Sequence, residues 1–331
     1  MRCALSIGLL WISLLLAGAE APTSRLPRVE LTGIDYVRID SWADANDYTG
    51  QWVVPRREYR VSNPSGDIVF NVDSRKISIR GVSIWLSHVI AIRDGHPLVS
   101  SRDLATAIHP ILFPQRNASS RKIRSIVLDP GHGGKDPGNQ EGKRKEKEFT
   151  LTLAREVKDL LVKAGFSVTL TRDRDTFIEL PSRPEIANRR GADLFVSLHF
   201  NSADGVGGST VKGSEVYCMT PVRASSTNAR GEGAGAGAYP GNRYDPKNVL
   251  LAYQIQKTLA NGGGMEDRGV KRARFAVLRD ATMPAVLIES AFMTNPGDAR
   301  AIYDPAQRKR LAQAIVDGIQ SYRRLAEQPR S

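Results

Sequence analysis

The chain has 331 residues, with 47 Lys and Arg against 35 Asp and Glu, and its formal net charge is +12. Hydrophobic residues make up 41% of it and only two cysteines are present, which excludes a disordered polymer, a collagen and a disulfide-stapled miniprotein. The length fits two domains, and the basic balance suggests an anionic partner, although it also simply favours solubility.

The N-terminus has the layout of a secretory signal peptide. Arg2 precedes an apolar run over residues 4–16, and small residues follow at 17–19. This run is shorter than the roughly 20 residues that cross a membrane, so we expect a signal peptide at residues 1–19 and no transmembrane anchor. Its removal lowers the net charge to +11 and leaves one cysteine, Cys218, so that no internal disulfide forms. We therefore expect an exported protein of the periplasm, cell envelope or extracellular space, with no nucleic-acid partner.

Residues 25–115 are predicted to form a small β-rich α+β module. Alternating apolar residues indicate strands at 68–72, 77–79 and 82–86. A short helix is expected at 102–108, started by a serine at 100 or 101 and ended near Pro110, and residues 116–122 are interpreted as a linker. Three histidines of this module match no metal-binding spacing and are interpreted as surface or turn residues: His88, His96 and His109.

From residue 123 the pattern changes to strands that alternate with amphipathic helices. This order predicts an α/β fold over residues 123–326, a mostly parallel twisted sheet with helices on both faces. Strands are expected at 126–128, 166–170, 194–198, 215–219, 275–278 and 285–288. Helices are expected at 149–163, 184–190, 249–259 and 307–325. Residues 221–247 form a Gly-rich insertion that joins a strand to a helix, and we expect it near the rim of a site, either as a disordered loop or as a lid.

Three polar residues stand where predicted strands end. His132 follows the first strand, His199 follows the strand at 194–198, and Glu289 follows the last one. Ligands gather outside the carboxyl ends of parallel strands, so these side chains are expected to converge on one rim. Ser197 lacks the setting of an activated nucleophile, which disfavours a His-based triad. Two histidines and a carboxylate instead suit a catalytic zinc ion, and proton transfer then falls to a carboxylate.

Four separated blocks in this region carry a family resemblance. They read IVLDPGHGGKDPG at 126–138, EKEFTL at 146–151, SLHFNS at 197–202 and PAVLIESAFMTN at 284–295. In this order they resemble the signature of the zinc-dependent N-acetylmuramoyl-L-alanine amidases, over residues 123–325. The resemblance implies that family's α/β sheet fold and one zinc ion held by His132, Glu146 and His199. It also implies that Glu289 is the catalytic residue.

Two assignments depend on this resemblance. The residues alone do not show which of Glu141, Glu146 and Glu148 would bind the metal. Glu146 can equally be interpreted as an acidic residue that the helix dipole favours at the start of a helix. Asn201, just past His199, is assigned either a contact with the substrate or a turn role.

The implied reaction is hydrolysis of the amide between N-acetylmuramic acid and the L-alanine of the stem peptide. We expect peptidoglycan as the partner of a monomeric enzyme, and the sequence identifies no protein activator. Two other functions stay open: a zinc peptidase acting on wall peptides, and a non-catalytic wall-binding regulator on the same scaffold.

The N-terminal module weakly resembles the N-terminal domain of some copper amine oxidases, through ISIRGVSIWLS at 77–87 and LVSSRDL at 98–104. This resemblance suggests targeting or substrate binding and names no ligand. Basic residues gather over 121–147, where eight stand against four acidic ones, and again over 268–274. We expect both clusters to present a surface to an anionic wall polymer.

Overall fold

A computed structural model describes residues 26–227 and 237–327, so the expected signal peptide at residues 1–19 lies outside the described part. Within these two ranges, no helix is long and apolar enough to cross a membrane. Below, the N-terminal module denotes residues 26–115, and the C-terminal part denotes residues 123–327.

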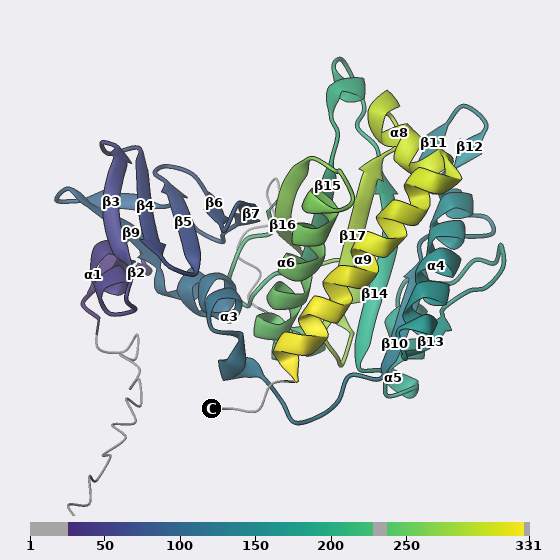
Figure 1. The fold of residues 1–331 in the computed structure, drawn as a ribbon, viewed down its shortest axis with the longest axis horizontal. Helices are drawn as coiled ribbons and strands as arrows, with labels where there is room; N and C mark the ends of the chain where they lie inside the picture. Colours follow the sequence, from purple (N-terminus) through teal and green to yellow (C-terminus); the bar gives the residue numbers. More distant parts are fainter. Residues whose placement is uncertain (1–25, 228–236, 328–331) are drawn as a thin grey trace, which may run out of the picture.

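Six strands of the C-terminal part lie side by side in the sheet order β13-β10-β14-β17-β15-β16 (Figure 1). Their bounds are β10 (Ser125–Pro130), β13 (Ser167–Leu170), β14 (Leu194–Asn201), β15 (Ser214–Met219), β16 (Asp267–Ala273) and β17 (Ala285–Phe292). The first four in the order are parallel, whereas β15 is antiparallel to β17 and parallel to β16. Buried apolar runs such as Ile126–Leu128 form the central strands because both sheet faces are covered.

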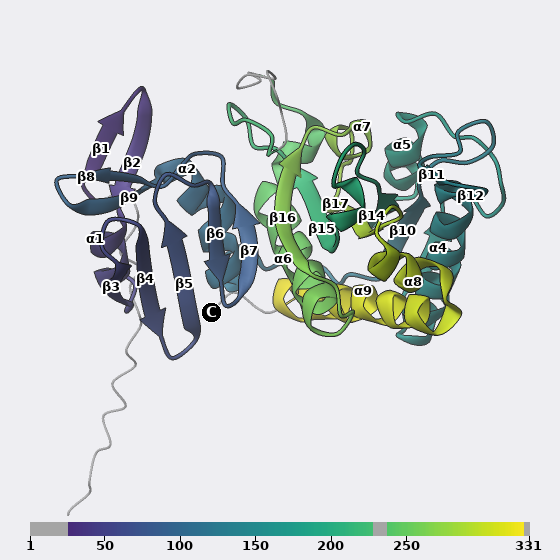
Figure 2. The ribbon, with the colours of Figure 1, turned by 90° about the horizontal axis from the view of Figure 1, so that it is seen from above.

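Helices cover both faces of this sheet, as Figure 2 shows. On one face lie α4 (Glu146–Lys163), α6 (Asp245–Asn261), α8 (Pro296–Tyr303) and α9 (Pro305–Ala326). On the other face lie α5 (Ser182–Arg189) and α7 (Ala276–Arg279). Alternate residues of each strand therefore enter two separate hydrophobic clusters: Ile126 and Leu128 pack toward α4, and Val127 packs toward α5. The predicted α/β fold with helices on both faces is confirmed.

The N-terminal module continues the same sheet. Its strands β3 to β7 extend it through a parallel contact between β7 and β16, in which Ile84 pairs with Val270. The bounds are β3 (Thr49–Val54), β4 (Glu58–Asn63), β5 (Gly66–Asn71), β6 (Lys76–Ile79) and β7 (Val82–Trp85). A smaller sheet contains β1 (Arg28–Leu31), β2 (Ile34–Arg38), β8 (Ala91–Arg93) and β9 (His96–Ser100), with α1 (Ile39–Asp44) beside it. Buried residues of the module and of the C-terminal part form one hydrophobic cluster.

The helix expected at residues 102–108 runs further than predicted. It begins as α2 (Ser101–Asp103), where Ser100 accepts a hydrogen bond from the Asp103 amide, and continues as a π-helical turn (Leu104–Ile108) and α3 (His109–Leu112). Pro110 does not end it. Because proline has no N–H, it cannot bond the carbonyl four residues earlier, that of Thr106. Arg272 Nη2 donates to this carbonyl at 2.6 Å, so the C-terminal part replaces a donor that the helix lacks.

The strand predicted at residues 275–278 is wrong, because these residues belong mostly to α7 and the strand is β16. The sequence of β16 contains Lys271 and Arg272, which suggested a charged surface. Both side chains are buried instead, because Lys271 pairs with Glu215 and Arg272 donates to the carbonyl of Met219. The expectation that this basic cluster faces an anionic polymer is therefore wrong for these two residues.

The insertion at residues 221–247 begins at the opposite ends of the strands from those predicted, away from the carboxyl ends of β10, β14 and β17. Because β15 is antiparallel to β17, its last residues lie beside the start of β17 and away from Glu289. The described ends of the insertion therefore do not adjoin the rim where β10, β14 and β17 end. Residues 228–236 lie outside the described part.

All three N-terminal histidines are half-buried residues of the module rather than fully exposed surface residues. Trp42 Nε1 donates to His109 Nε2 at 2.9 Å, and the two rings stack. His88 lies 3.2 Å from the hydroxyl of Ser100, whereas His96 pairs with Asp40 at a more exposed position. The spacing of the histidines in the sequence does not predict these contacts, because the partners of His109 and His96 are more than 50 residues away.

Candidate metal and catalytic site

His132 lies in the glycine-rich loop that follows β10. Its backbone has φ of 62°, a left-handed conformation that residues with a Cβ rarely adopt. Glycines let this loop fold tightly, since a Cβ on Gly138 would lie 2.6 Å from both the Glu146 carboxylate and the His132 ring. His132 Nδ1 lies 2.8 Å from Asp136 Oδ2, which directs the other ring nitrogen, Nε2, toward Glu146.

Glu146 is the first residue of α4, three residues before the predicted helix start. Its side chain is 1% exposed, and its two oxygens lie 3.0 Å from His132 Nε2 and 3.0 Å from His199 Nδ1. The amides of Phe200 and Asn139 also donate to it. Burial alone raises the pKa of Glu146, but the hydrogen bonds from the two histidines outweigh it and hold this pKa below its ordinary value.

The structure thus brings together the two histidines and the one glutamate of the predicted metal site. One ligand atom of each lies within 4.8 Å of the others, and His199 comes from the end of β14. No other group of three such side chains occurs in residues 26–227 and 237–327. Two imidazole nitrogens and a carboxylate are a donor set of catalytic zinc, and a carboxylate such as Asp136 on the far nitrogen is typical of metal-bound histidine. The residues present fit zinc.

Glu289 lies beside this cluster on β17, where it pairs in register with His199. Its Oε2 is buried and has no hydrogen-bond partner among the described residues. Burial raises the pKa of Glu289 well above its ordinary value, and the neighbouring carboxylates of Glu146 and Glu215 raise it further. A carboxylate with an unpartnered oxygen and a raised pKa is suited to take up a proton.

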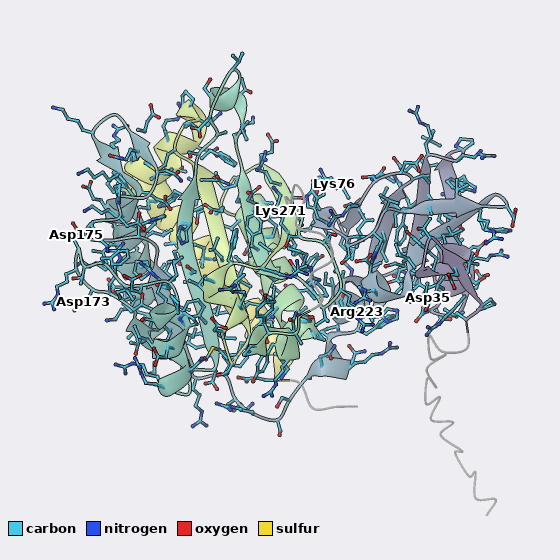
Figure 3. All side chains as sticks on the ribbon, turned by 180° about the vertical axis from the view of Figure 1, so that it is seen from behind. Asp35, Lys76, Asp173, Asp175, Arg223 and Lys271 are labelled. Atoms are coloured by element: carbon cyan, nitrogen blue, oxygen red, sulfur yellow. The ribbon has the colours of Figure 1, made fainter. Side chains whose placement is uncertain are left out.

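A buried charged cluster next to Glu289 was missed by sequence reasoning. Glu215, the cross-strand neighbour of Glu289, is 2% exposed and accepts hydrogen bonds from Lys271, from Arg268 Nε at 3.0 Å and from Tyr217 at 2.9 Å. Figure 3 shows Lys271 within the sheet, on the side toward the N-terminal module. The sequence signal for this cluster was the presence of Glu215 and Tyr217 on one face of β15, whose other residues are mostly apolar.

Asn201 belongs to this cluster. Its Nδ2 donates to Glu215 Oε1 at 2.9 Å, and its Oδ1 accepts from the Ser202 amide at 2.8 Å. Both ends of the amide are therefore bonded within the protein, and Asn201 links the end of β14 to the Glu215 carboxylate.

The first predicted basic cluster is partly a surface. Lys143 and Arg144 are exposed on a hairpin that leads into Glu146, formed by β11 (Gln140–Glu141) and β12 (Arg144–Lys145). Lys147 instead turns inward and pairs with Asp175 at 2.7 Å.

Comparison with known proteins covers the C-terminal part. Residues 126–321 match the family described as N-acetylmuramoyl-L-alanine amidase. The chain is 35% identical over 233 residues to the amidase AmiA of Escherichia coli (strain K12), covering 63% of this chain and 79% of AmiA. It is 38% identical over 200 residues to LytC of Bacillus subtilis (strain 168), covering 60% of this chain but only 36% of LytC.

Solved structures agree. The amidase AmiC2 of Nostoc punctiforme superimposes with a TM-score of 0.50 at 33% identity, over 62% of this chain and 98% of AmiC2. The family match begins after the N-terminal module, whose own resemblance stays a prediction. Over its C-terminal part, the chain belongs to the N-acetylmuramoyl-L-alanine amidases, enzymes that hydrolyse peptidoglycan.

Proposed function

We propose that this enzyme cleaves the amide between N-acetylmuramic acid and L-alanine with a zinc ion held by His132, Glu146 and His199. The observation that carries the proposal is the convergence of these ligand atoms within 4.8 Å, beside a carboxylate of Glu289 whose Oε2 is unpartnered in the described residues. Bound zinc supplies a Lewis acid that polarises the amide carbonyl and lowers the pKa of water toward about 7.

The protein's own groups divide the remaining work. Asp136 holds the ring of His132 in place through its hydrogen bond to Nδ1, the nitrogen that faces away from Glu146. Glu289 Oε2 accepts a proton from the attacking water and then donates it to the amine nitrogen of L-alanine as the amide breaks. Its buried Oε2 has no hydrogen-bond partner among the described residues, which leaves this oxygen free to take up the proton.

We also propose the setting of the enzyme. Action on peptidoglycan places it outside the cytoplasm, which agrees with the predicted signal peptide at residues 1–19 and with periplasmic or cell-envelope localisation. The exposed basic hairpin next to Glu146 suits an anionic wall polymer. For the N-terminal module, at residues 25–115 before the linker at 116–122, we propose targeting or substrate binding, and we propose a monomer.

The decisive experiment is a digest of purified sacculi analysed by mass spectrometry. Free stem peptides that begin with L-alanine indicate the amidase, shorter peptides indicate a zinc peptidase, and no products indicate a non-catalytic wall binder.

Variants test the residue roles. Glu289→Gln is expected to keep zinc and lose turnover by about 10²–10⁴-fold, because the proton acceptor is gone. His132→Ala is expected to lose both zinc and turnover. Glu148→Gln, at an exposed position of the same helix α4 as Glu146, is the matched control and should keep both. Wild-type turnover in Glu289→Gln would overturn the assignment.

A further inference from the structure

Arg183 of α5 contacts the loop that carries His132. Its side chain is 2% exposed and donates to four acceptors: Asp129 Oδ1 at 2.9 Å, the Pro130 carbonyl at 3.0 Å, the His132 carbonyl at 2.9 Å and the Ile178 carbonyl at 3.1 Å. One buried guanidinium therefore bonds the peptide of the residue whose backbone is left-handed.

Asp129 extends this contact to the second histidine. It is fully buried on β10, and its Oδ2 accepts from Ser197 Oγ at 2.8 Å. Ser197 lies on the neighbouring strand β14, two residues before His199, and Asp129 and Ser197 are partners in the parallel register. Thr171 Oγ1 also donates to Oδ1 of Asp129 at 2.6 Å. The pair of Arg183 and Asp129 thus connects the His132 loop to the strand that holds His199.

We propose that Arg183 is a positioning residue that, through Asp129, sets the separation of His132 and His199 and so the affinity of the metal site. The inference rests on the proposed zinc site. An arginine is required because its planar, forked guanidinium reaches several acceptors on different segments at once, whereas the single ammonium of lysine cannot. Arg183 does more than pack α5 against the sheet. Its hydrogen bonds end on the backbone carbonyl of His132 and on the carboxylate of Asp129, which in turn bonds Ser197 on the strand of His199.

Arg183→Lys tests the proposal, with Arg189→Lys as matched control. Arg189 is on the same helix, is exposed and pairs only with Glu185 in the described structure, at 2.6 Å. Zinc dissociation constants are measured by competition with a chelator of known affinity, and Co²⁺ substituted for zinc reports the ligand geometry by its visible absorption. We expect Arg183→Lys to bind zinc about 10–100-fold more weakly with an altered Co²⁺ spectrum, and Arg189→Lys to match the wild type.

Ser197→Ala provides a second variant should Arg183→Lys not fold, which circular dichroism of the metal-free protein reveals. It removes one hydroxyl and one bond to Asp129, and we expect weaker zinc binding in the same direction but by a smaller factor. Unchanged zinc affinity in the folded variants overturns the proposal. A wild-type protein that binds no zinc is a different failure, because it overturns the proposed zinc site itself.

Discussion

Replacing Gly131 by alanine tests whether the position of His199 governs the activity. Gly131 directly follows β10 and lies against the imidazole of His199. A Cβ at Gly131 would lie 2.2 Å from Cε1, 2.5 Å from Nε2 and 2.7 Å from Nδ1 of that ring. An ordinary contact begins at 3.4 Å, so one of the two groups must move by about 1.2 Å.

The backbone of Gly131 resists displacement, because both of its polar groups are hydrogen-bonded. Its amide donates to the Leu198 carbonyl at 3.0 Å, and its carbonyl accepts from Thr150 Oγ1 at 2.9 Å and from Arg172 Nη2 at 2.7 Å. We therefore expect the ring of His199 to move. A displacement of this size is more than half of a zinc–nitrogen bond of about 2.0–2.1 Å, and a misplacement of about 1 Å costs about 10²-fold in rate.

The assay measures kcat/KM for release of stem peptides from sacculi, together with zinc content after equilibration at limiting zinc. Gly131→Ala should lose at least about 100-fold in kcat/KM and should bind zinc more weakly. Gly237→Ala is the matched control, because a Cβ there meets no atom within 4 Å. Wild-type turnover and zinc binding in Gly131→Ala would refute the reasoning that the site tolerates no displacement of His199.

Two further predictions concern stability. Lys271→Met leaves the buried Glu215 with one cation fewer and should lower the free energy of unfolding in urea by about 3 kcal/mol. Lys212→Met removes an exposed ion pair and should change this free energy by less than about 1 kcal/mol. Equal effects of the two variants would contradict the burial argument. Burial lowers the pKa of His109 from 6.5 to about 4. As the pH falls, the unfolded chain therefore takes up a proton on this histidine before the folded protein does. We expect the free energy of unfolding to decrease by about 3 kcal/mol between pH 6.5 and pH 4. His109→Phe should flatten this dependence in unfolding measured at several pH values, and an unchanged slope would contradict the prediction.

Local patterns in the sequence predicted much of the C-terminal part. The apolar runs at residues 194–198 and 285–288 are strands β14 and β17, and the amphipathic stretch at 149–163 is most of α4. These predictions succeed because a strand buried on both faces must be apolar throughout, and a helix that covers a sheet must be apolar along one stripe.

Other elements depend on partners far along the chain. Strand β16 was missed because Lys271 and Arg272 are charged, and only the pairing with Glu215 and with backbone carbonyls makes their burial possible. The helix that passes Pro110 was cut short in the prediction because the compensating donor, Arg272, lies in the other part of the chain.

For the site, the sequence alone determined which chemical groups follow which strands, and the family resemblance singled out Glu146 from its neighbours. The tertiary structure decided that Glu146 lies between the two histidines, that Glu289 has a buried oxygen without a partner in the described residues, and that β15 runs antiparallel to β17. Because β15 is antiparallel to β17, the insertion at 221–247 begins at the end of the strands away from Glu289. The physical reason is that periodicity reports the burial of each segment, whereas strand direction, ion pairing and convergence of side chains are set by contacts between different segments, such as Glu146 with His199 and Glu215 with Lys271.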